Sequence, residues 1–446
     1  MAPRLTSVTA LLASNCTLRC AYCYQRPGGS LLMPWSALRA ALDVLLASSS
    51  PSVVVEFSGG EPLLAFPLIE RAVRYVERTR GARDVHYELT TNGTLLDPAR
   101  LEFLDTHDFV VNLSYHPVPG ERDRRNQAVF WRLDRLLDRL REHAQLWRER
   151  LHIAVTVDPR ELPHLADTVL YLLQKEVRDI GIAAAFGQPG WHTGDIARIE
   201  RQFARITRLV LDHRERTGYV PLSLYRTSPA EAVQGERGRS AARRRPLLPD
   251  LRCTGARGTA IAVGPTGQAW GCVMLAGARP VATMPPSSLA GRADASRGRA
   301  VPALSLAPSS PLWRFRLGDV RDEGFTRRLR SYASRVARAG VFSGRLTQRS
   351  SYAGCGTCRF LDRCSVCPVA VAFGPGGTDA GRVSDFVCAF TRVSQAHGER
   401  FPPGPALVNR LRGRAPVPVL VRELRRYAQR VRVAAPGRSG NYASSR

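Results

Sequence analysis

Apolar and polar positions follow two regular patterns along the first half of the 446-residue chain. Short apolar runs rich in β-branched residues recur, and stretches with apolar residues at helical spacing lie between them. The expected strands cover residues 6–12, 53–57, 85–89, 109–113, 151–157 and 180–185, and the expected helices include residues 35–46, 68–78, 126–146 and 162–173. Strands that alternate with helices pair in parallel through right-handed crossovers. The pattern therefore predicts an α/β fold built from six successive βα units.

Three cysteines follow directly after the first expected strand. Cys16, Cys20 and Cys23 have the spacing C-x3-C-x2-C. Soft thiolate ligands select iron–sulfur clusters, and three ligands for four irons leave one iron open to another molecule. Two other interpretations remain at this point: structural reduced cysteines, or three ligands of a zinc site. A zinc ribbon needs a second C-x2-C pair, and the next one begins only at Cys355.

The cysteine loop, with Tyr22 before its last cysteine, resembles the signature loop of the radical S-adenosylmethionine (radical SAM) enzymes. The resemblance implies a 4Fe-4S cluster whose open iron is chelated by the amino and carboxylate groups of SAM. Reduction of that cluster would cleave SAM to methionine and a 5'-deoxyadenosyl radical, which abstracts a hydrogen atom from a substrate. The resemblance also implies a partial (β/α)6 barrel of the TIM type, in which chemistry gathers at the C-terminal ends of the strands.

The second expected strand ends in a glycine-rich turn, Ser58-Gly59-Gly60-Glu61-Pro62. Two glycines allow close approach of the backbone to a ligand, and the Glu61 carboxylate can accept hydrogen bonds from an ammonium group. At this place in the chain the turn resembles the family's GGEP motif. We therefore expect Gly59, Gly60, Glu61 and Pro62 to bind the cofactor at the amino group of SAM, together with Tyr22.

The next two strand ends supply further candidates. Asn92 lies in a Thr-Asn-Gly-Thr run that recurs at this point in relatives, and Ser114 matches a serine that lies near the SAM ribose in the family. Relatives usually continue with x-Asp-Gly, whereas this chain has Tyr115-His116-Pro117. His116 has the pKa range suited to proton transfer, so Tyr115 and His116 are the catalytic candidates. The alternative is that His116 only satisfies a local hydrogen bond.

The remaining seven cysteines lie between residues 253 and 388. Their order resembles the SPASM domain, a C-terminal extension of many radical SAM peptide maturases, although one residue fewer separates the last two of the central four. By resemblance, one auxiliary 4Fe-4S cluster would be held by Cys355, Cys358, Cys364 and Cys388, and a second by Cys253, Cys272 and Cys367. The second cluster would have an open iron or a non-cysteine ligand such as Asp250. A zinc site built from Cys355, Cys358, Cys364 and Cys367 is the alternative.

Composition divides the chain into four regions. The expected domains are the radical SAM barrel at 1–215, an Arg-rich linker at 216–250, the SPASM domain at 251–395 with a Pro/Ala/Ser/Gly-rich insertion at 279–312, and a basic tail at 396–446.

The net charge of +27 comes almost wholly from arginine, because Lys175 is the single lysine. A nucleic-acid surface is one interpretation. We favour the coding bias of a high-GC genome, since the basic residues are scattered and no nucleic-acid motif accompanies them. No apolar run is long enough to span a membrane, and the polar residues Thr6, Ser7 and Thr9 argue against a signal peptide. We therefore expect a cytoplasmic protein whose cysteines bind metal.

These features predict a radical SAM enzyme that modifies a ribosomally made precursor peptide by crosslinking, thioether formation or oxidation. Val273 follows Cys272 at the position where sulfatase-maturing members carry aspartate, which argues against formylglycine formation. The alternatives are a dehydrogenase or epimerase acting on an aminocyclitol or sugar antibiotic intermediate, and a non-catalytic iron–sulfur binding or sensing protein. Expected partners are the peptide or small-molecule substrate, an electron donor such as flavodoxin or ferredoxin, and a separate leader-peptide recognition protein.

Overall fold

The structure is a computed structural model of the whole chain. It describes residues 4–20, 23, 25, 30–115, 124–159, 161–185, 194–226, 255, 257–276, 279–280, 305–306, 311–338, 358–360 and 385–401. The strands of the first half are β1 (Ser7–Leu11), β2 (Ser52–Ser58), β3 (Asp84–Thr91), β4 (Val110–Tyr115), β5 (Leu151–Val157) and β6 (Ile180–Ala184). The helices between and after them are α1 (Trp35–Leu46), η1 (Pro62–Ala65), α2 (Phe66–Thr79), α3 (Pro98–Thr106), α4 (Arg124–Leu140), η2 (Leu146–Arg150), η3 (Leu162–His164), α5 (Leu165–Gln174), α6 (Gly194–Thr217) and α7 (Ser223–Arg226).

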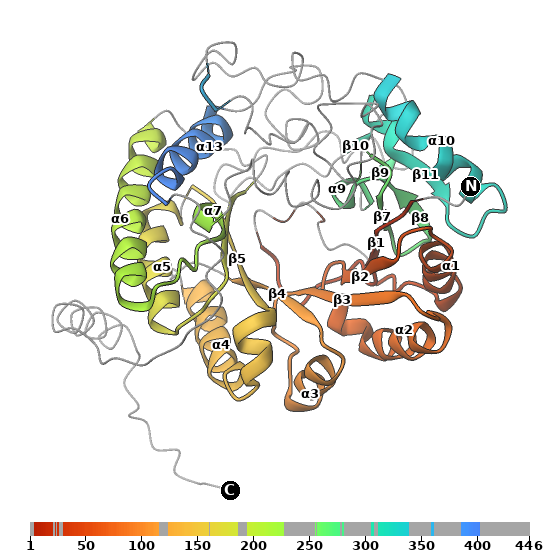
Figure 1. Cartoon of the computed structure of the whole chain (residues 1–446), viewed down its shortest axis with the longest axis horizontal. Coiled ribbons are helices and arrows are strands. Elements are labelled where there is room, and N and C mark those ends of the chain that lie inside the picture. Colours follow the sequence, from red (N-terminus) through yellow and green to blue (C-terminus); the bar gives the residue numbers. More distant parts are fainter. Residues whose placement is uncertain are drawn as a thin grey trace, which may run out of the picture.

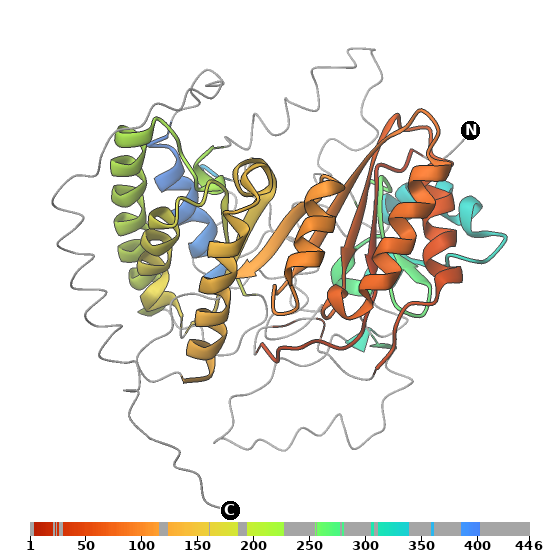
Figure 2. The same cartoon turned by 90° about the horizontal axis from the view of Figure 1, so that it is seen from below.

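Strands β1 to β6 pair in sequence order, and every pair is parallel. They form a curved wall, and helices α1 to α6 lie along its outer side (Figure 1). Seen from below, α1–α3 cover one half of the wall and α4–α6 the other (Figure 2). The predicted α/β class with a partial barrel is confirmed.

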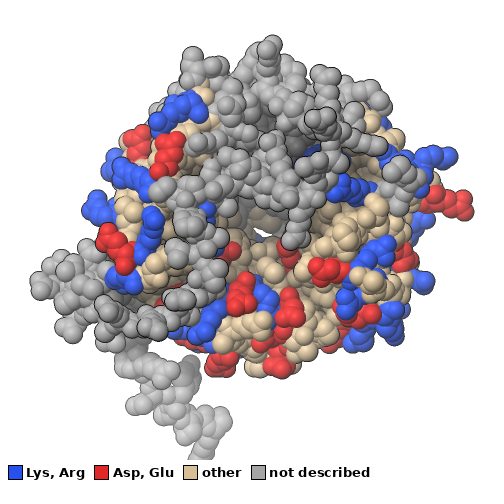
Figure 3. Space-filling view, viewed as in Figure 1, with Lys and Arg blue, Asp and Glu red and all other residues tan. Residues whose placement is uncertain are grey.

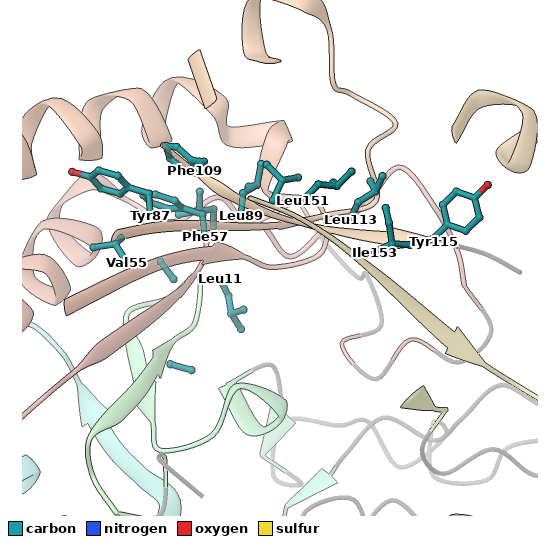
Figure 4. Packing of buried hydrophobic residues seen from close by; sticks show 14 of the residues in the cluster. Leu11, Val55, Phe57, Tyr87, Leu89, Phe109, Leu113, Tyr115, Leu151 and Ile153 are labelled. Atoms are coloured by element: carbon teal, nitrogen blue, oxygen red, sulfur yellow. The ribbon is translucent and has the colours of Figure 1, made fainter. Parts of the chain in front are cut away.

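The two faces of the wall follow from alternation within each strand. In β2, Val53, Val55 and Phe57 are buried, whereas Val54 and Glu56 are only half-buried. The buried set of each strand packs under the helices, as Figure 4 shows for a row of apolar side chains that ends at Tyr115. The half-buried set faces the inner side of the wall.

The helices bury the stripe that their spacing predicts. In α2, Ile69, Ala72, Val73 and Val76 are buried at successive helical turns. One predicted helix is longer than the observed one: the stretch 126–146 is helical only as far as Leu140, after which the chain turns. The apolar Leu146, at which the predicted helix ends, belongs instead to η2, where it and Trp147 are buried as that element leads into β5.

The described elements of the second half extend this sheet by three strands and add a separate two-stranded sheet. They are β7 (Ala260–Val263), β8 (Gln268–Trp270), α9 (Val273–Ala276), β9 (Arg279–Pro280), β10 (Ser305–Leu306), η6 (Pro311–Phe315), β11 (Arg316–Asp319), α10 (Phe325–Arg338) and α13 (Asp385–Gly398). Strand β7 pairs in parallel with β1, and β8 and β11 follow in antiparallel pairs. The order β11-β8-β7-β1-β2-β3-β4-β5-β6 thus places the start of the predicted SPASM region beside β1, the strand that precedes the cysteine loop. The domain boundaries themselves stay predictions.

Helix α13 closes the other end of the wall. It lies beside α6 in both views (Figures 1 and 2), where Phe203 and Phe390 meet edge to face at 5.2 Å. Thr207 of α6 contacts His397 of α13 at 2.8 Å. The chain therefore brings residues from its last quarter against the last helix of the barrel.

The described surface carries charges of both signs (Figure 3), and its helices are short or polar. Basic and acidic side chains are interspersed over the described part of the face seen in Figure 3, which is hollowed near its middle. Among the helices built from described residues, none combines the length and the apolar character needed to cross a membrane.

Candidate functional site

The cysteine loop is fastened to the turn after β2 by backbone hydrogen bonds. The Gly60 amide donates to the Ala13 carbonyl at 2.8 Å, and the Glu61 amide donates to the Asn15 carbonyl at 2.9 Å. Both acceptors lie within three residues of Cys16. The first cysteine therefore begins from a fixed position at the C-terminal end of β1.

The two glycines of this turn are required by close backbone approach. Gly59 has a φ of +138°, and a Cβ there would lie 2.8 Å from the Ala13 carbonyl oxygen. A Cβ on Gly60 would lie 2.0 Å from the Asn15 carbonyl oxygen. The two glycines were predicted to let a ligand come close to the backbone. In the structure, the group that comes close is the backbone of Ala13 and Asn15, directly before the cysteine loop. A contact of this turn with SAM stays a prediction, as does any role of Pro62, which is buried at the start of η1.

Glu61 is fully buried, and its carboxylate joins two segments of the chain. Its Oε1 accepts hydrogen bonds from the Leu63 amide at 3.1 Å and from the Thr91 hydroxyl at 2.7 Å, and its Oε2 accepts one from the Asn92 amide at 3.0 Å. Burial raises the pKa of Glu61, and these three donors act in the opposite direction. The carboxylate thus holds the end of β3 against the turn after β2. Its predicted contact with the SAM ammonium is an additional role that stays a prediction.

Asn92 connects the end of β3 to the first cysteine. Its Nδ2 donates to the Cys16 Sγ at 3.3 Å and to the Thr17 hydroxyl at 3.1 Å. Thr17 and Thr94 share a further hydrogen bond of 2.6 Å. Asn92 was predicted from the sequence, but Thr17 and Thr94 were not. Their positions next to Cys16 and close to Asn92 in the chain could have indicated them.

The three thiols of the loop are half-buried, and the surroundings of Cys16 suit a cluster ligand. Its sulfur accepts hydrogen bonds from the Leu18 amide at 3.4 Å and from Asn92. Burial raises the pKa of Cys16, and the nearby charges of Glu61 and Cys23 add to this effect. Among the described residues no three Cys, His, Asp or Glu side chains are yet gathered tightly enough to hold a metal ion. Three soft donors with amides directed at a sulfur nevertheless fit a 4Fe-4S cluster, and metal binding commonly gathers its own ligands.

Ser114 and Tyr115 lie on opposite faces of β4. Ser114 is half-buried on the inner face, the side on which the SAM ribose was expected. Tyr115 is 1% exposed and belongs to the apolar cluster under the helices, beyond Leu113 in Figure 4. Ser114 was predicted from its match to a serine of the family and Tyr115 from its place at the end of the strand, but alternation places only Ser114 where an inner ligand can reach it. His116 and Tyr22 lie outside the described residues.

A row of polar side chains on the inner face was not predicted. Glu56 accepts hydrogen bonds from the hydroxyls of Thr9 at 2.6 Å and Thr90 at 3.1 Å. Glu88 stands directly beside Glu56 in the register of β2 and β3. Burial raises the pKa of Glu88, and the charge of Glu56 raises it further. The sequence could have indicated this row, because polar residues recur at alternate positions within otherwise apolar strands.

Three cysteines of the second group lie within the described residues, and each is half-buried: Cys272, Cys358 and Cys388. Cys272 joins β8 to α9, and Cys388 lies in the first turn of α13. Arg392, one turn further along α13, directs its Nη1 to the Cys358 sulfur at 3.4 Å. A residue of α13 therefore contacts Cys358, and the grouping of Cys358 and Cys388 in one ligand set stays a prediction. The other predicted ligands lie outside the described residues: Cys253, Cys355, Cys364 and Cys367.

Sequence comparison identifies a known family in the first third of the chain. Residues 11–146 match the radical SAM superfamily. An uncharacterized protein of Methanocaldococcus jannaschii is 28% identical over 174 residues, and the GTP 3',8-cyclase of Chlorobaculum tepidum is 33% identical over 137 residues. A cysteine-type anaerobic sulfatase-maturating enzyme of Clostridium perfringens is 24% identical over 188 residues. These matches cover 38%, 29% and 40% of this chain and 59%, 40% and 50% of the relatives, so the chain spans about half of their length.

Solved structures match over more of the chain. The structure of anSMEcpe with bound AdoMet superposes on this chain with a TM-score of 0.63 at 14% identity. The match covers 96% of this chain and 98% of the anSMEcpe chain. SuiB of Streptococcus suis bound to the precursor peptide SuiA gives 0.51 at 14% identity and covers 86% and 76%. At such identities the likeness concerns the fold. Together with the matched residues and the loop built on Cys16, it shows that the chain contains a radical SAM domain.

Proposed function

We propose that Cys16, Cys20 and Cys23 hold a 4Fe-4S cluster that binds SAM, and that the protein uses the resulting 5'-deoxyadenosyl radical to abstract hydrogen from a substrate carbon. The observation that carries this proposal is the fastening of one cysteine loop to two strand ends, through Gly60 and Glu61 on one side and Asn92 on the other. The bound cluster would supply the electron that cleaves SAM. A loop fixed from two sides is what a site needs to hold a reactive group in one geometry.

The residues of this chain would position and shield that group. The turn at Gly59 and Gly60 brings its backbone within hydrogen-bond reach of the cysteine loop, so its remaining polar groups are suited to orient the amino end of SAM. Ser114, on the inner face of β4, would receive the ribose. The apolar layer that includes Tyr115 lies behind this face and keeps water from the sheet.

The second cysteine group would hold two auxiliary 4Fe-4S clusters. The proximity of Cys358 to α13, which carries Cys388, supports one of them. Cys272 lies on the strand system that continues from β1, so the other cluster would stand nearer the first cysteine loop. Their proposed task is to pass electrons or to grip the substrate.

The proposed substrate is a ribosomally made precursor peptide. Support comes from structures of similar fold solved with bound peptides: anSMEcpe with the Cp18Cys peptide and SuiB with SuiA. A radical SAM cyclopropyl synthase of Paramaledivibacter caminithermalis, 22% identical over 129 residues, is a further relative. Because Val273 replaces the aspartate expected of sulfatase maturases, we propose crosslinking, thioether formation or an oxidation other than formylglycine formation. Flavodoxin or ferredoxin would donate electrons, and a separate protein would recognise the leader peptide.

The proposal is tested with anaerobically reconstituted protein, SAM and dithionite, with and without the peptide encoded by a neighbouring short reading frame. We expect 5'-deoxyadenosine in both reactions and a mass change of the peptide in the second. Sugar-biosynthesis genes as neighbours, with conversion of an aminocyclitol and no change of any encoded peptide, would replace the peptide proposal. Absence of 5'-deoxyadenosine from protein with intact clusters would leave only the iron–sulfur binding alternative.

A further inference from the structure

The Asn92 side chain has a defined orientation toward the first cysteine. The Thr94 amide, which can only donate, lies 2.9 Å from one terminal atom of the side chain, so that atom is the oxygen. The other terminal atom is therefore the amide nitrogen, and it lies 3.3 Å from the Cys16 sulfur. The contact is thus an N–H···S hydrogen bond in which Asn92 is the donor.

The surroundings of Asn92 hold this donor in place. The side chain is 9% exposed, and its backbone amide is bound to the buried carboxylate of Glu61. Its oxygen accepts a second hydrogen bond from the Thr94 hydroxyl at 2.6 Å. Gly93, which follows, has a φ of +73° and allows the turn that carries these contacts. Both polar atoms of the side chain are therefore engaged within the protein.

We propose that Asn92 is a positioning residue that raises the reduction potential of the cluster held by Cys16, Cys20 and Cys23. The inference rests on the proposed function, because it requires that cluster. Hydrogen bonds to cluster sulfurs stabilise the reduced, more negative state, and such outer contacts tune a metal site as its ligands do. Asn92 thereby favours electron arrival at the cluster.

The size of the effect follows from the single bond lost. One hydrogen bond contributes a net free energy equivalent to about a threefold to tenfold change in an equilibrium constant. Only the part of this free energy that differs between the reduced and the oxidised cluster shifts the potential, so for a one-electron couple the shift is at most about 60 mV. Removal of the donor therefore shifts the midpoint potential downward by an amount that redox titration resolves.

The test compares two substitutions at Asn92 with the same substitutions at Asn112. Asn92→Asp keeps the oxygen that accepts from Thr94 but removes the N–H to Cys16, and Asn92→Ala removes both. Asn112, half-buried on the neighbouring strand β4, hydrogen-bonds to Glu88 and not to a sulfur, so Asn112→Asp and Asn112→Ala control for charge and truncation. The readout is the potential of the EPR signal that changes on addition of SAM, measured in the full chain with all clusters loaded, together with iron content.

We expect both Asn92 variants to retain iron and to titrate at a more negative potential, Asn92→Asp the more so, while both Asn112 variants titrate as the wild type does. Unchanged potentials in both Asn92 variants would overturn the inference. Weaker SAM binding at an unchanged potential would overturn it as well, because Asn92 would then act directly on the cofactor. A wild-type protein that assembles no SAM-responsive cluster would instead defeat the proposed function, so the two failures are distinguishable.

Discussion

The two groups of cysteines are held in different ways. Cys16 sits at the end of a strand and is fixed by contacts to the ends of the next two strands, all within the first hundred residues. Cys272, Cys358 and Cys388 come from three separate elements that lie far apart in the sequence. The barrel fixes the first ligand of the first site, Cys16, whereas the second site depends on the meeting of distant parts of the chain. We therefore expect the first site to be lost by local change and the second by loosening of tertiary packing.

The strongest test of this contrast removes the ligands themselves. Replacing Cys16, Cys20 and Cys23 by alanine should abolish SAM cleavage and remove about a third of the iron, four of roughly twelve atoms per chain. Iron analysis and measurement of 5'-deoxyadenosine check this expectation. The matched change, Cys388→Ala, should lower the iron content but leave SAM cleavage measurable. SAM cleavage that survives the triple change would refute the assignment.

The next largest effect concerns the support of the first loop. Glu61→Ala leaves three buried donors without their acceptor and should lower the free energy of unfolding by about 2 to 4 kcal/mol. Glu56→Ala, on the same strand system but half-buried, should cost less than about 1 kcal/mol because its hydroxyl donors can turn to water. Chemical denaturation followed by circular dichroism measures both. Equal decreases in the free energy of unfolding of the two variants would show that Glu61 has no special role in supporting the first cysteine loop.

A smaller, selective effect is expected at the second group. Arg392→Gln removes a positive charge beside Cys358 and should lower the reduction potential of an auxiliary cluster without altering SAM cleavage. Arg359→Gln is the matched control, since Arg359 follows Cys358 in the chain but pairs with Glu399 at 3.0 Å. Redox titration followed by EPR distinguishes the variants. A shifted potential of the SAM-responsive signal in the Arg392 variant would contradict the prediction that Arg392 affects only the second site.

The smallest effect is a pH dependence of stability that arises from two histidines, His213 and His397. Burial lowers the pKa of His213 on α6 from its ordinary 6.5 to about 4, and burial also lowers the pKa of His397 on α13. The unfolded chain then binds more protons than the folded one, so the free energy of unfolding falls as pH drops from about 6.5 to about 4. Thermal unfolding across this window measures the slope. His213→Gln should flatten it, and an unchanged slope in that variant would contradict the assignment.

How far the sequence predicts this molecule depends on the range of the interactions. Period-two and helical patterns predicted β1 to β6, because each strand buries one face under its own helices. The same patterns wrongly extended helix α4 to residue 146. Leu146 is apolar and buried after a turn, so in the sequence it resembles part of a further helical turn. The joining of β7 to β1 was not visible, because strand pairing across 250 residues leaves no local signal.

The site shows the same division. Motif spacing selected Cys16, Glu61 and Asn92, and the structure brings them into one network. Motif position could not decide which way a side chain faces, so Tyr115 was named as a catalytic candidate although it is buried on the face opposite to Ser114. Arg392 was missed because its contact with Cys358 exists only once α13 has packed.

The central claim is that the first cysteine loop leaves one iron of its cluster open to SAM. Mössbauer and EPR spectra of oxygen-free, reduced protein test it directly when recorded before and after addition of SAM. We predict that SAM alters one iron of a single 4Fe-4S cluster, the cluster that is absent from the triple cysteine variant. Spectra that do not respond to SAM in protein with intact clusters, or a loop occupied by tetrahedral zinc, would contradict the account.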